Sequence, residues 1–136
     1  MKEKIHHIGI AVNKLEKSLE SWAHLFGLEK GEIEEIKDRG VKVATLQFDK
    51  GPQIELLEAI GDGSPIKKFI DNHGEGIHHI CLKTNDLDQK IAELKREGIR
   101  FVQETPVAGA GGSRIIFVHP ENLNGVLIEL KEEKKQ

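Results

Sequence analysis

The first third of the chain changes from a period-two to a helical pattern of apolar residues. Segment 5–12 alternates between aliphatic and other residues, which predicts a strand with one buried face. From 15 to 26, apolar residues recur every three or four positions, which predicts a helix that Gly27 ends. Asn13 is expected to cap this helix, with Glu16 as its capping-box partner.

The rest of the chain continues with short strands and two more helices. In the first half, further strands are predicted near 29–37, 41–48 and 53–59. Ser64 and Pro65 begin a linking helix that reaches about residue 73. In the second half the predicted elements are a strand at 77–84, a helix at 87–97, and strands near 100–103, 114–119 and 126–131. The glycine-rich segment 109–112 is expected to form a flexible loop.

The two halves share sequence as well as pattern. His6-His7-Ile8-Gly9-Ile10 recurs as His78-His79-Ile80-Cys81-Leu82 at an offset of 72 residues, and Ile54-Glu55-Leu56 recurs as Ile128-Glu129-Leu130 at an offset of 74. Two unrelated β–α units could share an amphipathic pattern, but ordered matches along both halves favour a duplication. We therefore predict one domain, 1–136, built from modules at about 5–60 and 77–131 that the helix at about 64–73 links.

Strand alternation selects one histidine from each pair as a candidate site residue. His6 shares a face with the aliphatic residues of its strand, so His7 points to the opposite face. The same reasoning separates His79 from His78. The four residues that lie opposite the aliphatic stripe of their own strands are His7, Glu55, His79 and Glu129. Two imidazoles and two carboxylates are suitable ligands for a divalent metal, and leave about two positions open if the ion is six-coordinate.

Composition argues against several classes of protein. A formal net charge of −3 with both signs interspersed argues against a nucleic-acid surface, and no apolar run is long enough for a membrane span. The one cysteine, Cys81, excludes an internal disulfide and fits a reducing compartment, so a cytoplasmic location is expected.

At this point the chain resembles the vicinal oxygen chelate superfamily of paired βαβββ modules (glyoxalases, bleomycin resistance proteins and dioxygenases), and within it the methylmalonyl-CoA epimerases. The motifs that carry this resemblance are 5–12, 64–66, 76–80, 109–120 and 125–130. The resemblance implies an α+β fold in which two tandem modules form an open, cupped eight-stranded mixed sheet with the metal site in its concavity.

The resemblance also implies an activity and a ligand set. The expected enzyme is an isomerase that interconverts (2R)- and (2S)-methylmalonyl-CoA through a metal-stabilised enolate, and it is expected to be a homodimer. The implied metal ligands are His7, Glu55, His79 and Glu129, with Glu129 also carrying the C2 proton. The expected cofactor is a divalent ion, Co²⁺ before Mn²⁺, Ni²⁺, Zn²⁺ or Mg²⁺. Some epimerases place a second proton-transferring glutamate where this chain has Val43, so the second proton carrier is unassigned.

Three other activities in the superfamily compete with this interpretation. A glyoxalase-type lyase would use the same ligands on a thiohemiacetal. An extradiol dioxygenase would use two histidines and one carboxylate on redox iron, and Glu129 as a fourth ligand argues against it. A protein that sequesters a small molecule without a metal would have no need of repeated metal-ligand residues.

Overall fold

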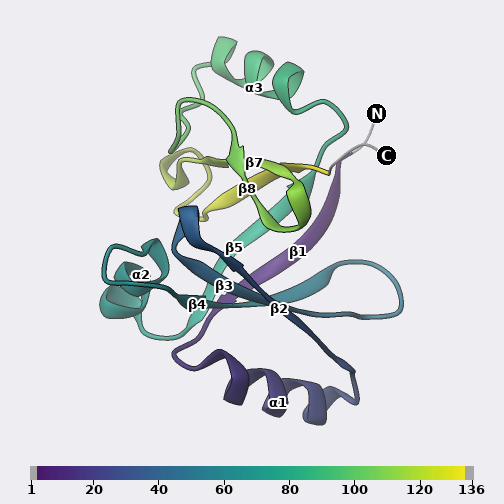
Figure 1. Ribbon diagram of the computed structural model, residues 1–136. Helices are drawn as coiled ribbons and strands as arrows, with labels where there is room; N and C mark the ends of the chain where they lie inside the picture. The colour runs from purple at the N-terminus through teal and green to yellow at the C-terminus, as the bar shows by residue number, and fades with distance from the viewer. Residues whose placement is uncertain (1–2, 134–136) are drawn as a thin grey trace. The chain divides into compact units, whose positions relative to one another are not determined.

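A computed structural model describes residues 3–133 of the chain (Figure 1). The chain divides into two compact units. The first unit spans residues 7–78, and the second comprises residues 3–6 together with 79–133. The division therefore falls within the first strand of each module, just before His7 and His79.

The first unit is built from one βαβββ module and the linking helix. Its elements are β1 (Lys4–Ala11, which begins in the other unit), α1 (Leu15–Phe26), β2 (Lys30–Ile36), β3 (Val41–Leu46), β4 (Gln53–Ala59) and α2 (Pro65–His73). The strand order is β2-β3-β4-β1. Strands β2, β3 and β4 are antiparallel neighbours, whereas β4 and β1 are parallel. Parallel pairing at this point follows because α1 and two strands connect β1 to β4.

The second unit has the same plan. Its elements are β5 (Gly76–Lys83, which begins in the first unit), α3 (Leu87–Arg96), β6 (Val107–Ala108), β7 (Arg114–Val118) and β8 (Ile128–Glu132). The strand order is β5-β8-β7-β6, with β5 and β8 parallel and the other neighbours antiparallel. The described residues thus contain two βαβββ modules with mixed pairing, and the predicted α+β class is confirmed.

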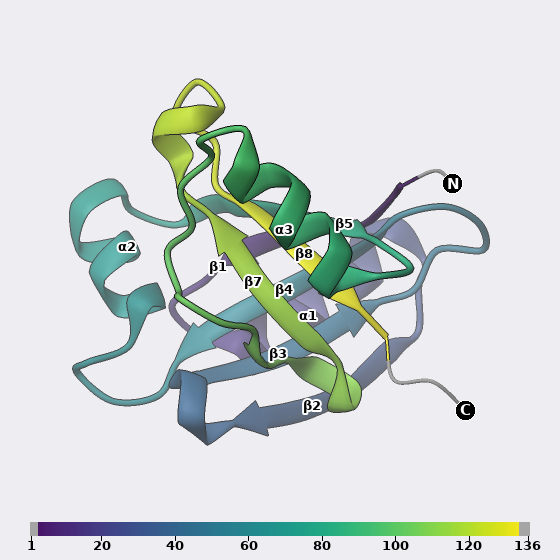
Figure 2. The same cartoon turned by 90° about the horizontal axis from the view of Figure 1, so that it is seen from above.

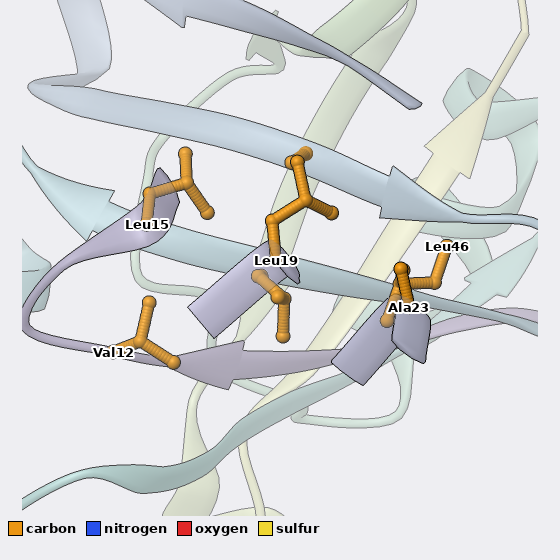
Figure 3. Close-up of a cluster of buried hydrophobic side chains, with 7 residues drawn as sticks. Val12, Leu15, Leu19, Ala23 and Leu46 are labelled. Atoms are coloured by element: carbon orange, nitrogen blue, oxygen red, sulfur yellow. The ribbon is translucent and has the colours of Figure 1, made fainter. Parts of the chain in front are cut away.

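Helices α1 and α3 cover the aliphatic faces of the strands in their own units. The cluster beneath α1 includes Val12, Leu15, Leu19, Ala23 and Leu46 (Figure 3). Ile54 and Leu56 of β4 belong to the same cluster. In the second unit α3 lies along β8 (Figure 2), and Leu130 packs with Leu87 and Ile91. The alternation predicted for these strands is confirmed, because their aliphatic residues face the helices.

The other face of the first unit is partly covered by α2. Ala11, Val43 and Leu57 pack there against Ile66. Helix α2 begins at Pro65, as predicted, and Ser64 caps it, since its hydroxyl accepts a hydrogen bond from the Ile66 N–H at 3.2 Å.

Three sequence predictions about local structure were wrong. Lys14, not Asn13, is the N-cap of α1, and it provides no side-chain cap. Segment 100–103 is not a strand: it forms one isolated bridge to β7, and the Gln103 side chain accepts the Phe117 N–H that a strand partner would take. The short strand β6 forms instead at Val107–Ala108. Strand β8 also begins two residues later than predicted, after a turn in which Asn124 and Gly125 adopt positive φ.

No helix among residues 3–133 is long and apolar enough to cross a membrane.

Candidate metal centre

His7 and Glu55 form a buried pair in the first unit. They come from the parallel neighbours β1 and β4, in which Gly9 is the register partner of Glu55. His7 Nε2 lies 3.3 Å from Glu55 Oε1. The two residues are only 2% and 6% exposed, so both polar groups are largely removed from water. A histidine and a glutamate buried this deeply require a partner or a ligand.

His79 and Glu129 repeat this arrangement in the second unit. They come from β5 and β8, where Cys81 is the register partner of Glu129. His79 Nε2 lies 3.0 Å from Glu129 Oε1, and the residues are 5% and 7% exposed. Phe117 packs edge-on against the His79 ring, with ring centroids 5.6 Å apart, which restricts its orientation. The same two atom types therefore face each other in both units.

The other histidine of each doublet has a different environment. His6 Nε2 is 3.8 Å from a Glu133 carboxylate oxygen, and the His6 side chain is 23% exposed. His78 packs edge-on against Phe69 of α2, with ring centroids 5.0 Å apart. His119 caps the short 3₁₀ turn after β7, because its Nδ1 accepts the Glu121 N–H. The partners described for these three side chains are thus Glu133, Phe69 and Glu121.

The geometry of each pair suits two neighbouring ligands on one metal ion. Nitrogen and oxygen ligands bind first-row ions at about 2.1 Å, so adjacent ligands lie about 3.0 Å apart at right angles and about 3.4 Å apart at the tetrahedral angle. The observed separations of 3.3 and 3.0 Å fall in this range. A simple imidazole–carboxylate hydrogen bond would have a similar length, so metal content has to be measured.

Val43 and its polar neighbours Lys42 and Gln47 have different environments. Val43 is buried, pairs with Leu57 and packs in the α2 cluster, so its position offers only hydrocarbon. Lys42 projects from the other side of the sheet, with its Nζ 3.9 Å from a Glu58 carboxylate oxygen. Gln47 follows β3 and is exposed. In the first unit, Glu55 is the acid beside a candidate histidine.

Sequence reasoning missed two carboxylates that position the strands. The Glu58 carboxylate accepts the Leu15 N–H at the start of α1 at 2.7 Å, and Glu132 accepts the Leu87 N–H at the start of α3 at 2.9 Å. Both glutamates lie three residues after a candidate ligand on the same strand. The offset of 74 residues that relates Glu55 to Glu129 also relates Glu58 to Glu132, and this signal could have identified them.

A charged groove of about 760 Å³ lies on the α1 side of the first unit. Its lining includes Lys14, Glu20, Lys42 and Glu58. Because Lys42 and Glu58 project from the sheet face opposite Glu55, this groove is separate from the His7–Glu55 pair.

Comparison with known proteins gives consistent matches. The sequence model of the Glyoxalase/Bleomycin resistance protein/Dioxygenase superfamily matches residues 6–117. A mitochondrial methylmalonyl-CoA epimerase of Dictyostelium discoideum is 37% identical over 131 residues, which cover 96% of this chain and 78% of that protein.

Solved structures agree over nearly the whole chain. Methylmalonyl-CoA epimerase from Mycobacterium tuberculosis is 35% identical, with a TM-score of 0.92, 97% of this chain covered and 89% of that one. Streptomyces coelicolor methylmalonyl-CoA epimerase in complex with 2-nitronate-propionyl-CoA is 34% identical, with a TM-score of 0.92 and coverage of 97% and 98%. The predicted tandem-module fold class is therefore confirmed.

Proposed function

The chain belongs to the glyoxalase/bleomycin resistance protein/dioxygenase superfamily, and we propose that it is an epimerase that interconverts (2R)- and (2S)-methylmalonyl-CoA. Two observations together carry this proposal. Relatives that match nearly the whole of this chain are named for this activity, and the chain itself holds two buried His–Glu pairs. The competing lyase and small-molecule-binding activities have no comparable support.

We assign all four paired residues to one divalent ion: His7, Glu55, His79 and Glu129. Support comes from their repeated placement, their burial and the N···O separations within each pair. The donor set fits Co²⁺, Mn²⁺, Ni²⁺, Zn²⁺ or Mg²⁺, and we propose Co²⁺. When bound, such an ion supplies Lewis-acid stabilisation of negative charge on substrate oxygens.

Glu129 is the proposed carrier of the substrate proton. The hydrogen on C2 of methylmalonyl-CoA lies between a thioester and a carboxylate, so its removal leaves an enolate. The Glu129 carboxylate takes this proton as a general base. The aliphatic residues behind it, including Leu130, fix the strand that presents it, and Phe117 on the adjacent strand is its register partner.

Inversion at C2 also needs a proton donor on the opposite face of the enolate. Val43 occupies the position where some family members carry a glutamate, and its hydrocarbon side chain has no ionisable proton. We consider two candidates for the donor, Glu55 and a water molecule. Replacing Glu55 with Gln distinguishes these two: loss of epimerisation with metal retained assigns the step to Glu55.

The test is a chiral assay of metal-loaded protein. Purified chain reconstituted with Co²⁺ is incubated with the (2S) epimer alone and, separately, with the (2R) epimer alone. Both reactions should converge on the same mixture. Glu129→Gln should abolish this convergence, whereas His6→Ala should retain it. Retention of the starting epimer by protein that carries a full complement of metal would refute the proposal.

The assembly and location of the protein are further proposals. A homodimer is proposed by analogy with the superfamily, and size-exclusion chromatography with light scattering tests it. A cytoplasmic location is supported by the single buried Cys81, which fits a reducing compartment.

A further inference from the structure

Lys131 is a buried lysine on the strand face that presents Glu129. The two residues are separated by Leu130, whose side chain packs on the opposite face in the α3 cluster. Alternate residues of a strand point the same way and lie about 7 Å apart, so Lys131 projects beside Glu129. Lys131 is only 6% exposed. Lysine is rarely buried to this extent without a partner.

Within residues 3–133, the Lys131 ammonium makes no hydrogen bond or ion pair. The nearby carboxylate of Glu133 is held instead by Lys83, the register partner of Lys131, at 2.6 Å. The pKa of Glu133 is lowered chiefly by the hydrogen bond from Lys83, with smaller contributions from His6 and Lys131. Lys131 therefore shares the Glu133 carboxylate with Lys83, which forms the hydrogen bond to it.

The internal repeat shows that this lysine is not required by the fold. In the first unit, the position equivalent to Lys131 is Leu57, two residues after Glu55, and it packs in the α2 cluster. Cross-strand pairing agrees, since Val43 pairs with Leu57 where Ile115 pairs with Lys131. An apolar residue therefore satisfies this position in one module. In the other module the same place holds a largely buried lysine side chain that ends in a positive charge, which an anionic ligand on this face would complement.

We propose that the Lys131 ammonium binds the free carboxylate of the acyl-CoA substrate and makes the site selective for carboxylated thioesters. This inference rests on the proposed function. The position of Lys131 favours the carboxylate over the phosphates of coenzyme A. The carboxylate is attached directly to C2, the atom from which Glu129 takes its proton, whereas the phosphates are many bonds away.

The experiment compares binding of three ligands to Co²⁺-loaded protein by isothermal titration calorimetry. Methylmalonyl-CoA has both the carboxylate and the phosphates, propionyl-CoA lacks the carboxylate, and methylmalonyl-pantetheine lacks the nucleotide phosphates. The variants are Lys131→Met, Lys131→Arg and, as a matched control, Lys90→Met. Lys90 lies on α3, which covers the opposite face of β8, and it pairs with Glu3 at the surface.

Lys131→Met should weaken binding of both carboxylated ligands by about 10- to 100-fold, the usual effect of losing a hydrogen bond to a charged group. Its affinity for propionyl-CoA should change by less than about twofold, because that ligand lacks the group that Lys131 contacts. Lys131→Arg should retain most of the preference for the carboxylated ligand, and Lys90→Met should retain all of it. Glu133→Gln removes the competing carboxylate, so it should strengthen binding of methylmalonyl-CoA.

Equal weakening of methylmalonyl-CoA and propionyl-CoA, with methylmalonyl-pantetheine unaffected, would assign Lys131 to the phosphates and overturn the proposal. Unchanged affinities in Lys131→Met would also overturn it. The ratio of affinities within one variant does not depend on the fraction of protein that binds, so partial unfolding does not obscure the result. If the affinities for the carboxylated and uncarboxylated ligands change as predicted but the wild-type protein does not epimerise methylmalonyl-CoA, the proposed function is contradicted and the role of Lys131 in binding is not.

Discussion

Glu58 on β4 and Glu132 on β8 each accept a hydrogen bond from the first N–H group of a helix, α1 and α3 respectively. These two hydrogen bonds should contribute differently to stability. In α1, Lys14 offers no side-chain cap, and the Leu15 N–H donates to Glu58 at 2.7 Å. In α3, Asp86 already accepts the Gln89 N–H, so Glu132 is a second cap. We therefore expect Glu58→Ala to destabilise the protein more than Glu132→Ala.

The magnitude follows from the contacts that are lost. A helix cap contributes about 0.5–2 kcal/mol, and a negative charge beside a helix N-terminus adds about 0.3–1 kcal/mol. The Glu58 side chain is 25% exposed, and its ion pair with Lys42 at 3.9 Å contributes little. Glu58→Ala should cost about 1–2 kcal/mol, and Glu132→Ala about half as much. The melting temperature should fall by about 4–8 °C for Glu58→Ala.

Urea denaturation of the metal-free protein measures these differences without a contribution from ligand binding. Glu58→Gln should lie between wild type and Glu58→Ala, because the amide oxygen still accepts a hydrogen bond but the charge is gone. Glu32→Gln on the exposed part of β2 is the control and should have no effect. Equal stabilities of wild type and Glu58→Ala, or a larger loss in Glu132→Ala, would refute the reasoning.

Three further predictions concern the metal, the core and one surface ion pair. Alanine at any one of the four proposed ligands should lower the metal content measured by mass spectrometry. These ligands are His7, Glu55, His79 and Glu129. His6→Ala should keep the wild-type metal content. Equal metal retention in all five variants would contradict the assignment. Leu130→Ala removes a residue that is 2% exposed and should cost about 2–5 kcal/mol in urea denaturation; a loss below about 1 kcal/mol would contradict its place in the core. The hydrogen bond from Arg114 lowers the pKa of Asp88 below its usual value near 3.8. The stabilisation from this ion pair is therefore fully present above that usual value, and it is lost as the pH falls through the lower pKa of the folded state. NMR titration should show this shift and its loss in Arg114→Met; an unchanged Asp88 pKa in that variant would exclude Arg114 as the cause.

The elements that depend on local periodicity could be predicted well from the sequence. Strand β4 has the predicted bounds, and α2 begins after Ser64 as expected, since the pattern and the cap are both local. The choice of His7 over His6 needed only strand alternation and the repeat. Each chosen histidine indeed lies beside a glutamate within its own unit.

The predictions that failed depended on partners distant in sequence. Asn13 looked like a helix cap, but the carboxylate that accepts the first helical N–H comes from Glu58 on another strand. Segment 100–103 looked like a strand, but the Gln103 side chain takes the N–H of Phe117. The burial of Lys131 was also hidden, because strand alternation gives the direction of a lysine but not what covers it.

Proton exchange at C2 is the most direct test of the central claim. Methylmalonyl-CoA is incubated in deuterium oxide with the Co²⁺-loaded protein and observed by ¹H NMR. The C2 proton signal should disappear, and the methyl doublet should collapse as deuterium enters, with wild-type protein but not with Glu129→Gln. A C2 proton that persists with fully metal-loaded wild-type protein, at the rate of the enzyme-free control, would contradict the account.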